Sequence, residues 1–345
     1  MYEKLQKRVD DLFKNAPDTK RAEELKEELM ANLIDRYNDL TGSGKSEDEA
    51  IDITIEGIGD VNELIRSIGG GAEPVRKNSR NQYEEEMLPD GCDKIRLDFS
   101  NYDIEISTTN EDKIRVVQSS SEKISREEKM TIIRDGRCIN IKGNDKSLYF
   151  NLFNFGSSSN KIGLFIPRNY HQDLEIITTS GDIEILDELE LNRLTCFQVS
   201  GDLEVKRNLY INNFTSKTTS GDMEIPKLET EFYKMCTISG DINIRSLTGS
   251  GEISATSGDI DIENLKINDY SNVKSISGDI DLSAALNMGF VFDANTVSGD
   301  IDSDFNLNYK NKRGNKAEAT YGEEPYKKIS VSTVSGDINL KNQQK

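Results

Sequence analysis

Thr-Ser-Gly-Asp-Ile-Asp-Ile, residues 256–262, is one copy of a stretch that the chain repeats with small changes. Each copy holds Ser-Gly-Asp, then an apolar residue, an acidic or amide residue and, in every copy but one, a second apolar residue. Successive copies start 20, 20, 19, 18, 20, 21 and 37 residues apart. A fixed period near 20 is typical of stacked coils that each contact only their neighbours. The eight copies begin at Ser180, Ser200, Ser220, Ser239, Ser257, Ser277, Ser298 and Ser335.

Alternation within the repeat predicts a half-buried β-strand. Counting each coil from its Ser, the apolar residues stand at positions 4 and 6, as Ile260 and Ile262 do, and the β-branched residue before the Ser has the same parity. We therefore expect these three residues to point inward, and the Ser, the Asp and position 5 to point outward. The Gly shares the inward parity, which predicts a bend where backbone crosses a corner. One such strand per coil predicts a mostly β fold, a parallel β-solenoid with about 20 residues per coil and the usual right-handed crossover.

The outward Asp at position 3 raises an electrostatic problem. In register, neighbouring carboxylates would lie about 4.8 Å apart, where two unit charges repel by roughly 1 kcal/mol even in water. One solution is that each Asp accepts hydrogen bonds from backbone N–H groups at the Gly bend, as Asp does in turns. The other is a row of cation sites, with Ca²⁺ as the candidate, because hard cations take oxygen ligands. The candidate residues are Asp182, Asp202, Asp222, Asp241, Asp259, Asp279 and Asp300.

Composition and charge narrow the classes of function. The 345 residues suffice for two domains and a sizeable core. The net charge of −19 argues against nucleic acid and anionic membrane surfaces as partners, since both select basic patches. It is compatible with divalent cations or basic partners. No apolar run reaches the length of a membrane span and the N-terminus lacks an apolar signal core, so we expect a cytoplasmic chain that reaches the envelope only through a partner.

The four cysteines do not indicate a metal site or a disulfide framework. No pair among Cys92, Cys138, Cys196 and Cys236 has metal-ligand spacing. Cys196 and Cys236 both occupy position 17 of their coils, two coils and therefore roughly 9.6 Å apart, which is too far for a disulfide. We expect them to be buried small residues.

Residues 1–70 are predicted to form a small all-α domain. Leu5 and Val9 share a helical face, and Ser46 with Glu49 three residues later is a capping box. The motifs Gly44-Lys45-Ser46-Glu47-Asp48-Glu49-Ala50-Ile51 and Ile58-Gly59-Asp60-Val61-Asn62-Glu63-Leu64-Ile65 resemble the HAAS domain at the N-terminus of many Firmicutes membrane-associated regulators. The resemblance implies a helical adaptor that binds a protein partner or a second copy of itself. In that family membrane helices usually follow the domain, whereas none is expected here.

The composition of residues 71–92 predicts a flexible linker, and strands begin near Asp93. Residues 100–106 look like a degenerate first repeat. The aromatic stretch 148–155 suits core or end-cap packing, with a ligand surface as the alternative. Between Ser298 and Ser335 a basic insert predicts a loop that leaves the coil near residue 308 and returns near Lys328. Residues 338–340 would then be the last edge strand, protected by the polar tail.

The segment Ile162-Gly163-Leu164-Phe165-Ile166-Pro167-Arg168, an apolar strand ending at a proline, precedes the first full repeat. A strand of this kind followed by Ser-Gly-Asp repeats resembles the bacterial putative-adhesin family of Ser-Gly-Asp β-solenoid domains, over about residues 93–345. The resemblance implies a β-solenoid and envelope-associated or envelope-stress roles. It implies no catalytic residues.

The sequence does not indicate a reaction. His171 is the only histidine and has no identifiable nucleophile beside it, so we expect a surface loop residue. Gly-Ser-Gly at 249–251 lacks the strand, lysine and helix of a phosphate loop and indicates a local shift in the coil. Right-handed β-helices include polysaccharide lyases, but the absence of Trp weakens a sugar-binding groove. No catalytic or cofactor-binding residue is predicted.

Two functions of different classes follow. The first is a non-enzymatic structural or interaction protein, an adhesin-like β-solenoid with a helical adaptor in cell-envelope or envelope-stress regulation. The second is a carbohydrate- or Ca²⁺-binding surface module, either an adhesin or a polysaccharide-active β-helix. Calcium-dependent melting and glycan binding would favour the second.

Overall fold

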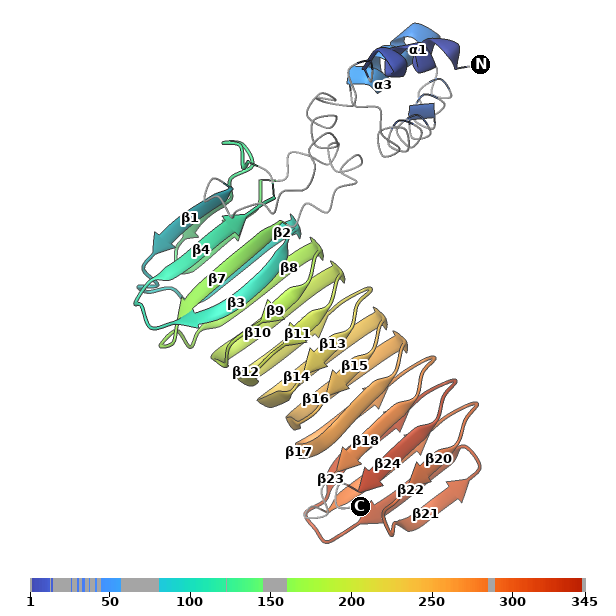
Figure 1. The fold of residues 1–345 in the computed structure, drawn as a ribbon. Coiled ribbons are helices and arrows are strands. Elements are labelled where there is room, and N and C mark those ends of the chain that lie inside the picture. Colours follow the sequence, from blue (N-terminus) through green and yellow to red (C-terminus); the bar gives the residue numbers. More distant parts are fainter. Residues whose placement is uncertain are drawn as a thin grey trace, which may run out of the picture. The chain divides into compact units, whose positions relative to one another are not determined.

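The computed structural model describes residues 2–12, 45–56, 81–121, 123–144, 160–284 and 289–342, with isolated positions between 14 and 41. The chain divides into two compact units. One holds residues 1–80 and 146–157, and the other holds residues 81–145 and 158–345. The second unit is mostly β, as expected (Figure 1). Within the described residues, no helix has both the length and the apolar character needed to cross a membrane.

The first unit contains two described helices, α1 (Glu3–Leu12) and α3 (Glu47–Glu56). Leu5 and Val9 of α1 are buried, as are Ala50 and Ile51 of α3. The predicted capping box forms, since the Ser46 N–H donates to Glu49 Oε2 at 3.3 Å and the Glu49 N–H donates to Ser46 Oγ at 3.4 Å. The second motif of the resemblance, residues 58–65, and the aromatic stretch 148–155 lie outside the described residues.

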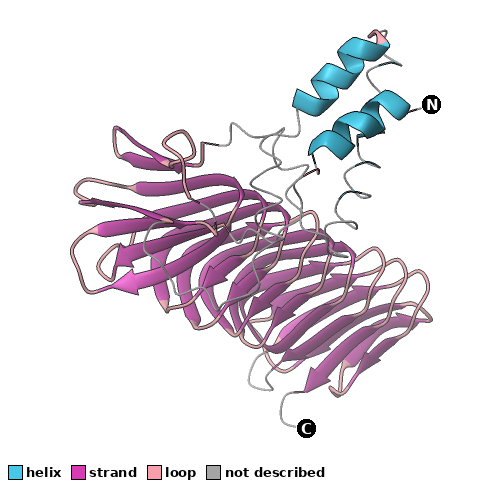
Figure 2. Cartoon of the chain, turned by 45° about the horizontal axis from the view of Figure 1, so that its top comes forward, coloured by secondary structure: helices cyan, strands magenta, loops and turns pink. Residues whose placement is uncertain are grey.

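The second unit is a stack of coils whose strands pair in parallel (Figure 2). Each coil has one strand that carries positions 4 and 6, here called its short strand because it has three residues in most of the central coils. The strand on the other side of the corner is here called the long strand of the coil. Ile104 and Ile106 of the first short strand pair in register with positions 4 and 6 of the next coil, which confirms the degenerate first repeat at residues 100–106. The short strands are β3 (Asp103–Thr109), β9 (Ile183–Ile185), β11 (Leu203–Val205), β13 (Met223–Ile225), β15 (Ile242–Ile244), the start of β17 (Ile260–Lys274), β18 (Ile280–Ala284), β20 (Ile301–Ser303) and β24 (Ile338–Asn342). The long strands are β2 (Lys94–Asn101), β8 (Asp173–Ser180), β10 (Leu189–Ser200), β12 (Asn208–Lys217), β14 (Lys227–Ser239), β16 (Leu247–Ser257), the end of β17, β19 (Phe290–Asn295) and β23 (Lys327–Ser332).

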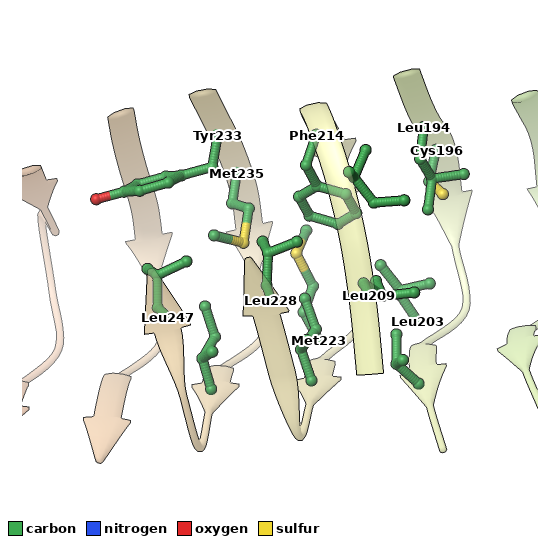
Figure 3. Close-up of a cluster of buried hydrophobic side chains, with 14 of the residues drawn as sticks. Leu194, Cys196, Leu203, Leu209, Phe214, Met223, Leu228, Tyr233, Met235 and Leu247 are labelled. Atoms are coloured by element: carbon green, nitrogen blue, oxygen red, sulfur yellow. The ribbon is translucent and has the colours of Figure 1, made fainter. Parts of the chain in front are cut away.

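Aliphatic columns fill the interior, because register places equivalent inward residues of neighbouring coils against each other (Figure 3). Positions 4 and 6 are buried in the coils, as predicted, with the half-buried Ser303 as the exception. One column departs from this pattern. Tyr233 projects over Gly251 of the next coil, which has no side chain, and donates a hydrogen bond to Ser271 Oγ at 2.7 Å. Burial raises the pKa of the Tyr233 phenol. The predicted shift in the coil at residues 249–251 is present as a break in register.

The bend glycine packs against backbone and not into the core. All eight repeat glycines have φ between +115° and +154°, a region that side chains rarely adopt. A Cβ on Gly258 would collide with the carbonyl oxygen of Gly240 in the preceding coil. The predicted bend is present, and the glycine is required there by backbone-to-backbone stacking and not by an inward position.

The expected parity fails across this bend. The residue before each Ser, predicted to point inward, is exposed in all eight repeats. The residue two before the Ser is buried instead, and it is usually a Thr or Ser that bonds a carbonyl of the bend. Thr178 Oγ1, for example, donates to Ser180 O at 3.2 Å, and Thr333 Oγ1 donates to Gly278 O at 3.3 Å. The positive-φ glycine breaks the alternation, so parity cannot be carried from one strand to the next.

The expectation that Cys236 is buried is wrong, because one corner of its coil is a residue shorter than in the preceding coil. Two residues, Lys206 and Arg207, join β11 to β12, whereas Pro226 alone joins β13 to β14. Register therefore aligns Met235 with Ser216, and Met235 takes the buried place. Cys236 moves to a half-buried place, while Cys196 stays buried, and burial raises its thiol pKa to about 12. All four cysteines are free.

At the N-terminal end, chain order and spatial order differ. β2 lies between β8 and β6 (Cys138–Lys142), and β3 lies between β9 and β7 (Lys161–Pro167). Antiparallel strands close this end: β4 (Ile114–Ser119) pairs with β7, β1 (Gln82–Met87) pairs with β4, and β5 (Thr131–Asp135) pairs with β6. β1 lies within residues 71–92, the range expected to be a flexible linker. Its Tyr83 and Met87 pack against the core, and this packing explains why the segment forms a strand.

The C-terminal end has the same insertion. β24 lies between β18 and β20, and β23 lies between β17 and β19, so the last repeat in sequence is the second last in space. The expectation that residues 338–340 form the outer edge is therefore wrong. The expected loop is a hairpin, β21 (Asn308–Arg313) and β22 (Lys316–Tyr321), which pairs antiparallel with β19. Phe290, Phe305 and Tyr321 cover the core there, with ring centroids 4.8 to 5.3 Å apart.

We predict that Gly258→Ala lowers the free energy of unfolding by about 3 kcal/mol, because the added Cβ meets the Gly240 carbonyl as well as an unfavourable φ. Gly314→Ala is the matched control. It also has a positive φ but open space around its Cβ, so it should cost about 1 kcal/mol. Urea unfolding of both variants measures the difference. Equal losses would show that backbone stacking does not constrain the bend.

Candidate interaction surface

The Asp column forms a hydrogen-bonded ladder. Each carboxylate except that of Asp300, which lies in the last coil, accepts a hydrogen bond at Oδ1 from the backbone N–H of the Asp in the next coil. The Asp202 N–H donates to Asp182 Oδ1 at 2.9 Å, and the Asp279 N–H donates to Asp259 Oδ1 at 2.7 Å. The series runs from Asp103 to Asp300 with distances of 2.7 to 3.1 Å. The first solution to the repulsion, backbone N–H donors, is thus confirmed, with the donors on the neighbouring coil.

This ladder explains how the chain tolerates a row of carboxylates. A charged acceptor strengthens each N–H···O bond, which offsets the repulsion between neighbouring carboxylates. Within the described part of the chain, no group of three or more His, Cys, Asp or Glu side chains has an arrangement that could hold a metal ion. The structure brings Asp182, Asp202, Asp222, Asp241, Asp259, Asp279 and Asp300 together in one row. Asp337, which the sequence reasoning did not include, lies between Asp279 and Asp300, and Asp300 ends the row as a donor only.

The position-5 residues form a second acidic row beside the first. Lys206 pairs with Glu184 at 3.4 Å and also with Glu204, and Lys341 pairs with Asp281 at 2.7 Å. Burial and the neighbouring Asp281 raise the pKa of the Asp261 carboxyl. Where Pro226 shortens the corner, an open groove of about 350 Å³ is lined by Glu224, Asp261, Glu263 and Arg245 among others. The groove would favour a basic side chain.

The eight exposed residues that precede the Ser residues form a continuous row, here called the bend ridge. In spatial order they are Thr179, Val199, Thr219, Ile238, Thr256, Ile276, Val334 and Val297. The apolar members are about half exposed: 52% for Val199, 49% for Ile238, 54% for Ile276, 48% for Val334 and 65% for Val297. Insertion of the last repeat places Val334 between Ile276 and Val297, so three apolar residues adjoin at the C-terminal end.

The backbone groups of the bend ridge already form hydrogen bonds between neighbouring coils, so a partner would contact the side chains. The Ser220 N–H donates to Val199 O, and the Ser335 N–H donates to Ile276 O, both at 2.9 Å. A partner strand could not pair there by edge addition. Half-exposed Val and Ile side chains in a row on a chain of charge −19 make the bend ridge a candidate binding surface. Sequence reasoning missed this surface, although a Thr or Ser stands two places before the Ser in six of the eight repeats, and this is the position that is buried.

His171 lies at an open groove of about 320 Å³ whose lining includes Tyr210, Glu190, Glu229 and Asn212. It is exposed, as expected, and its Nδ1 lies 3.0 Å from Glu190 O. The Lys227 ammonium lies over the Tyr210 ring, 5.2 Å from its centroid, and pairs with Glu229 at 2.8 Å. One face of the aromatic ring is thus already used within the chain. The hydroxyl of Thr230, which also lines the groove, donates to the backbone carbonyls of Asn212 and Phe232 and not to His171.

Comparisons with known proteins match the solenoid. The model of the family described as Toastrack DUF4097 matches residues 92–341. The comparison with curated proteins gave no match. Similar solved structures include a putative adhesin from Bacteroides fragilis (13% identity, 78% of this chain and 100% of that chain, TM-score 0.45). Others are a putative cell adhesion protein from Clostridium sporogenes (12%, 76% and 98%, TM-score 0.26) and a putative lipid binding protein from Parabacteroides distasonis (14%, 76% and 97%, TM-score 0.36). At these identities and TM-scores the three likenesses carry no argument about function.

We predict that Asp259→Ala lowers the free energy of unfolding by about 1–3 kcal/mol in the presence of a chelator, because the Asp279 N–H loses its acceptor. Asp259→Asn, which keeps an oxygen at that place, should cost less. Thermal melting in chelator and in calcium measures both. If Asp259→Ala is neutral in chelator yet abolishes a calcium-induced rise in Tm, the column is a row of cation sites.

Proposed function

The chain belongs to the Toastrack DUF4097 family over residues 92–341, and from this premise we propose that it is a non-enzymatic, adhesin-like interaction protein that binds a protein partner along the bend ridge. The observation that carries the proposal is the row of half-exposed Val and Ile side chains on a regular, rigid surface. The Asp ladder runs along the same bend. The fitting partner therefore presents apolar residues flanked by Lys or Arg.

The proposal extends to the helical module and to the place of action. Residues 1–70 would act as an adaptor that selects a protein partner or a second copy, in regulation of the cell envelope or of its stress response. The division of the chain into two compact units and the capping box of α3 support a helical module that folds independently of the solenoid. The chain would act in the cytoplasm and reach the envelope through that partner.

Carbohydrate or Ca²⁺ binding is the second candidate, and the groove at His171 favours it. Its Tyr210, Glu229 and Asn212 supply the aromatic and polar groups that a sugar would use. Glycan binding that Tyr210→Ala removes would establish this function. Glycan binding without such an effect would place the glycan elsewhere.

We predict that the combined change Ile276→Thr, Val334→Thr and Val297→Thr abolishes binding of the native partner while Tm stays within a few degrees of the wild type. Thr already occupies the same row at residues 179, 219 and 256, so the fold should tolerate it. Ile133→Thr is the matched control, since Ile133 is also about half exposed but lies on β5. Quantitative capture from native cells with each variant measures the effect.

Deletion of residues 1–70 tests the adaptor role in the same capture experiment. Loss of the partner from the truncated chain, with the solenoid still folded, would support selection by the helical module. If neither the ridge change nor the deletion alters the captured proteins or the oligomeric state, the proposed function is wrong.

A further inference from the structure

The two ends of the solenoid present free edge strands of opposite charge. β1 pairs with β4 on one side, and β21 pairs with β22 on one side. Among the described strands, β4 is the only partner of β1 and β22 is the only partner of β21. Within this described part of the chain, each of the two therefore has a row of backbone N–H and C=O groups without a strand partner. Both strands contain six residues, with a tyrosine at the second place, Tyr83 and Tyr309.

The C-terminal edge is basic. Lys310, Lys312 and Arg313 of β21 are exposed, and Lys316, opposite Arg313 in the hairpin, adds a fourth positive charge. None of the four has a carboxylate partner within the described residues. Lys312 lies over the Tyr309 ring, 5.0 Å from its centroid. A cluster of four unpaired cations on a chain of charge −19 indicates an acidic partner.

The N-terminal edge is acidic. Glu84, Glu85 and Glu86 of β1 are exposed, and the turn before β4 adds Glu111 and Asp112. Three cations of the same end sheet offset part of this charge, because Lys113 pairs with Glu86 at 2.6 Å, Arg115 pairs with Glu84 at 3.6 Å, and Lys129 lies over the Tyr83 ring. Glu85 accepts a hydrogen bond from the Tyr83 hydroxyl and has no cation partner. The end therefore keeps a net negative charge.

We propose that copies of this chain associate head to tail, with β1 of one copy paired to β21 of the next. Two β21 edges brought together would repel, and so would two β1 edges, so only the mixed pairing is favourable. The two surfaces differ, which makes the contact heterologous, and a heterologous contact at opposite ends of a rod produces open filaments. This contact is separate from the bend ridge and does not depend on the proposed function.

The opposing interpretation is that the charges only protect each edge from association, as charged edge strands commonly do. Charge exchange separates the two interpretations. The variant Lys310→Glu/Lys312→Glu changes the charge of strand β21 itself from +3 to −1. The variant Glu84→Lys/Glu85→Lys changes the charge of strand β1 from −3 to +1. In each variant alone, β1 and β21 carry charge of the same sign, so its copies should repel one another end to end. In a mixture of the two variants, each contact between unlike copies again joins strands of opposite charge.

Sedimentation velocity of the full chain over a range of concentrations is the measurement. At low ionic strength the wild type should form species larger than dimers, and about 0.5 M salt should dissociate them because it screens the charges. Each double variant should stay monomeric, and an equal mixture of the two should recover assembly within about tenfold of the wild-type dissociation constant. Lys234→Glu, a surface change on β14 far from both ends, is the control and should assemble normally.

Three outcomes would overturn the proposal. A wild type that sediments as a monomer at every concentration and salt would do so. Assembly that persists in either double variant would also do so, as would a mixture that stays monomeric while both variants keep wild-type circular dichroism and Tm. The bend-ridge triple variant should assemble like the wild type, so loss of partner binding and loss of assembly can be told apart.

Discussion

The carbonyl oxygen of each bend glycine lies where the Cβ of the next bend residue would be, and the register of the whole stack depends on this contact. A side chain at the bend would push neighbouring coils apart at one corner, and the aliphatic columns on the other faces would lose their vertical alignment. The Asp ladder acts at the same corner, since each Oδ1 accepts one N–H of the next coil. The close contact at the glycine and the hydrogen bond to the Asp carboxylate thus select the same register between coils. The two residues are adjacent in sequence.

The fixed register decides what the surface offers. Carboxylates at position 3 are used as acceptors within the stack, and several at position 5 are paired with Lys206 or Lys341. The acidic charge of the chain is thus largely part of its architecture, and it does not mark a site by itself. What the architecture leaves unused is the bend ridge, whose backbone is paired and whose Val and Ile side chains are half exposed. A surface of this kind suits recognition by side-chain packing better than catalysis.

At both ends of the solenoid, the same topology gives the coil that is outermost in sequence pairing partners on both sides. The coil that is outermost in sequence, β2–β3 at one end and β23–β24 at the other, is inserted one place inward, where neighbours on both sides pair with its strands. Antiparallel strands and the parallel strand β20 take the outermost places, and an aromatic cluster around Phe290 covers the core at the C-terminal end. Among the strands that pair on one side only, β1 and β21 differ in charge, and this difference would decide association between copies.

The sequence by itself determined the coil period, the parallel stacking, the inward places of Ile260 and Ile262 and the capping box at Ser46, because each depends on spacing within one strand or one turn. It also predicted N–H donors for the Asp column. Only the tertiary structure decided which side of the bend Val199 and Ile276 occupy, because a positive-φ glycine resets the alternation, and which donor each Asp uses, because that donor lies on another coil. It also decided the position of Cys236, since a single-residue corner at Pro226 shifts the register, and the order of the last two coils. The repeat spacing does not distinguish the two places, although the polar Ser303 at position 6 of β20 suits the outer one. The hairpin β21–β22 and the aromatic cap, formed by residues distant in sequence, make β20 and β21 the outer edge.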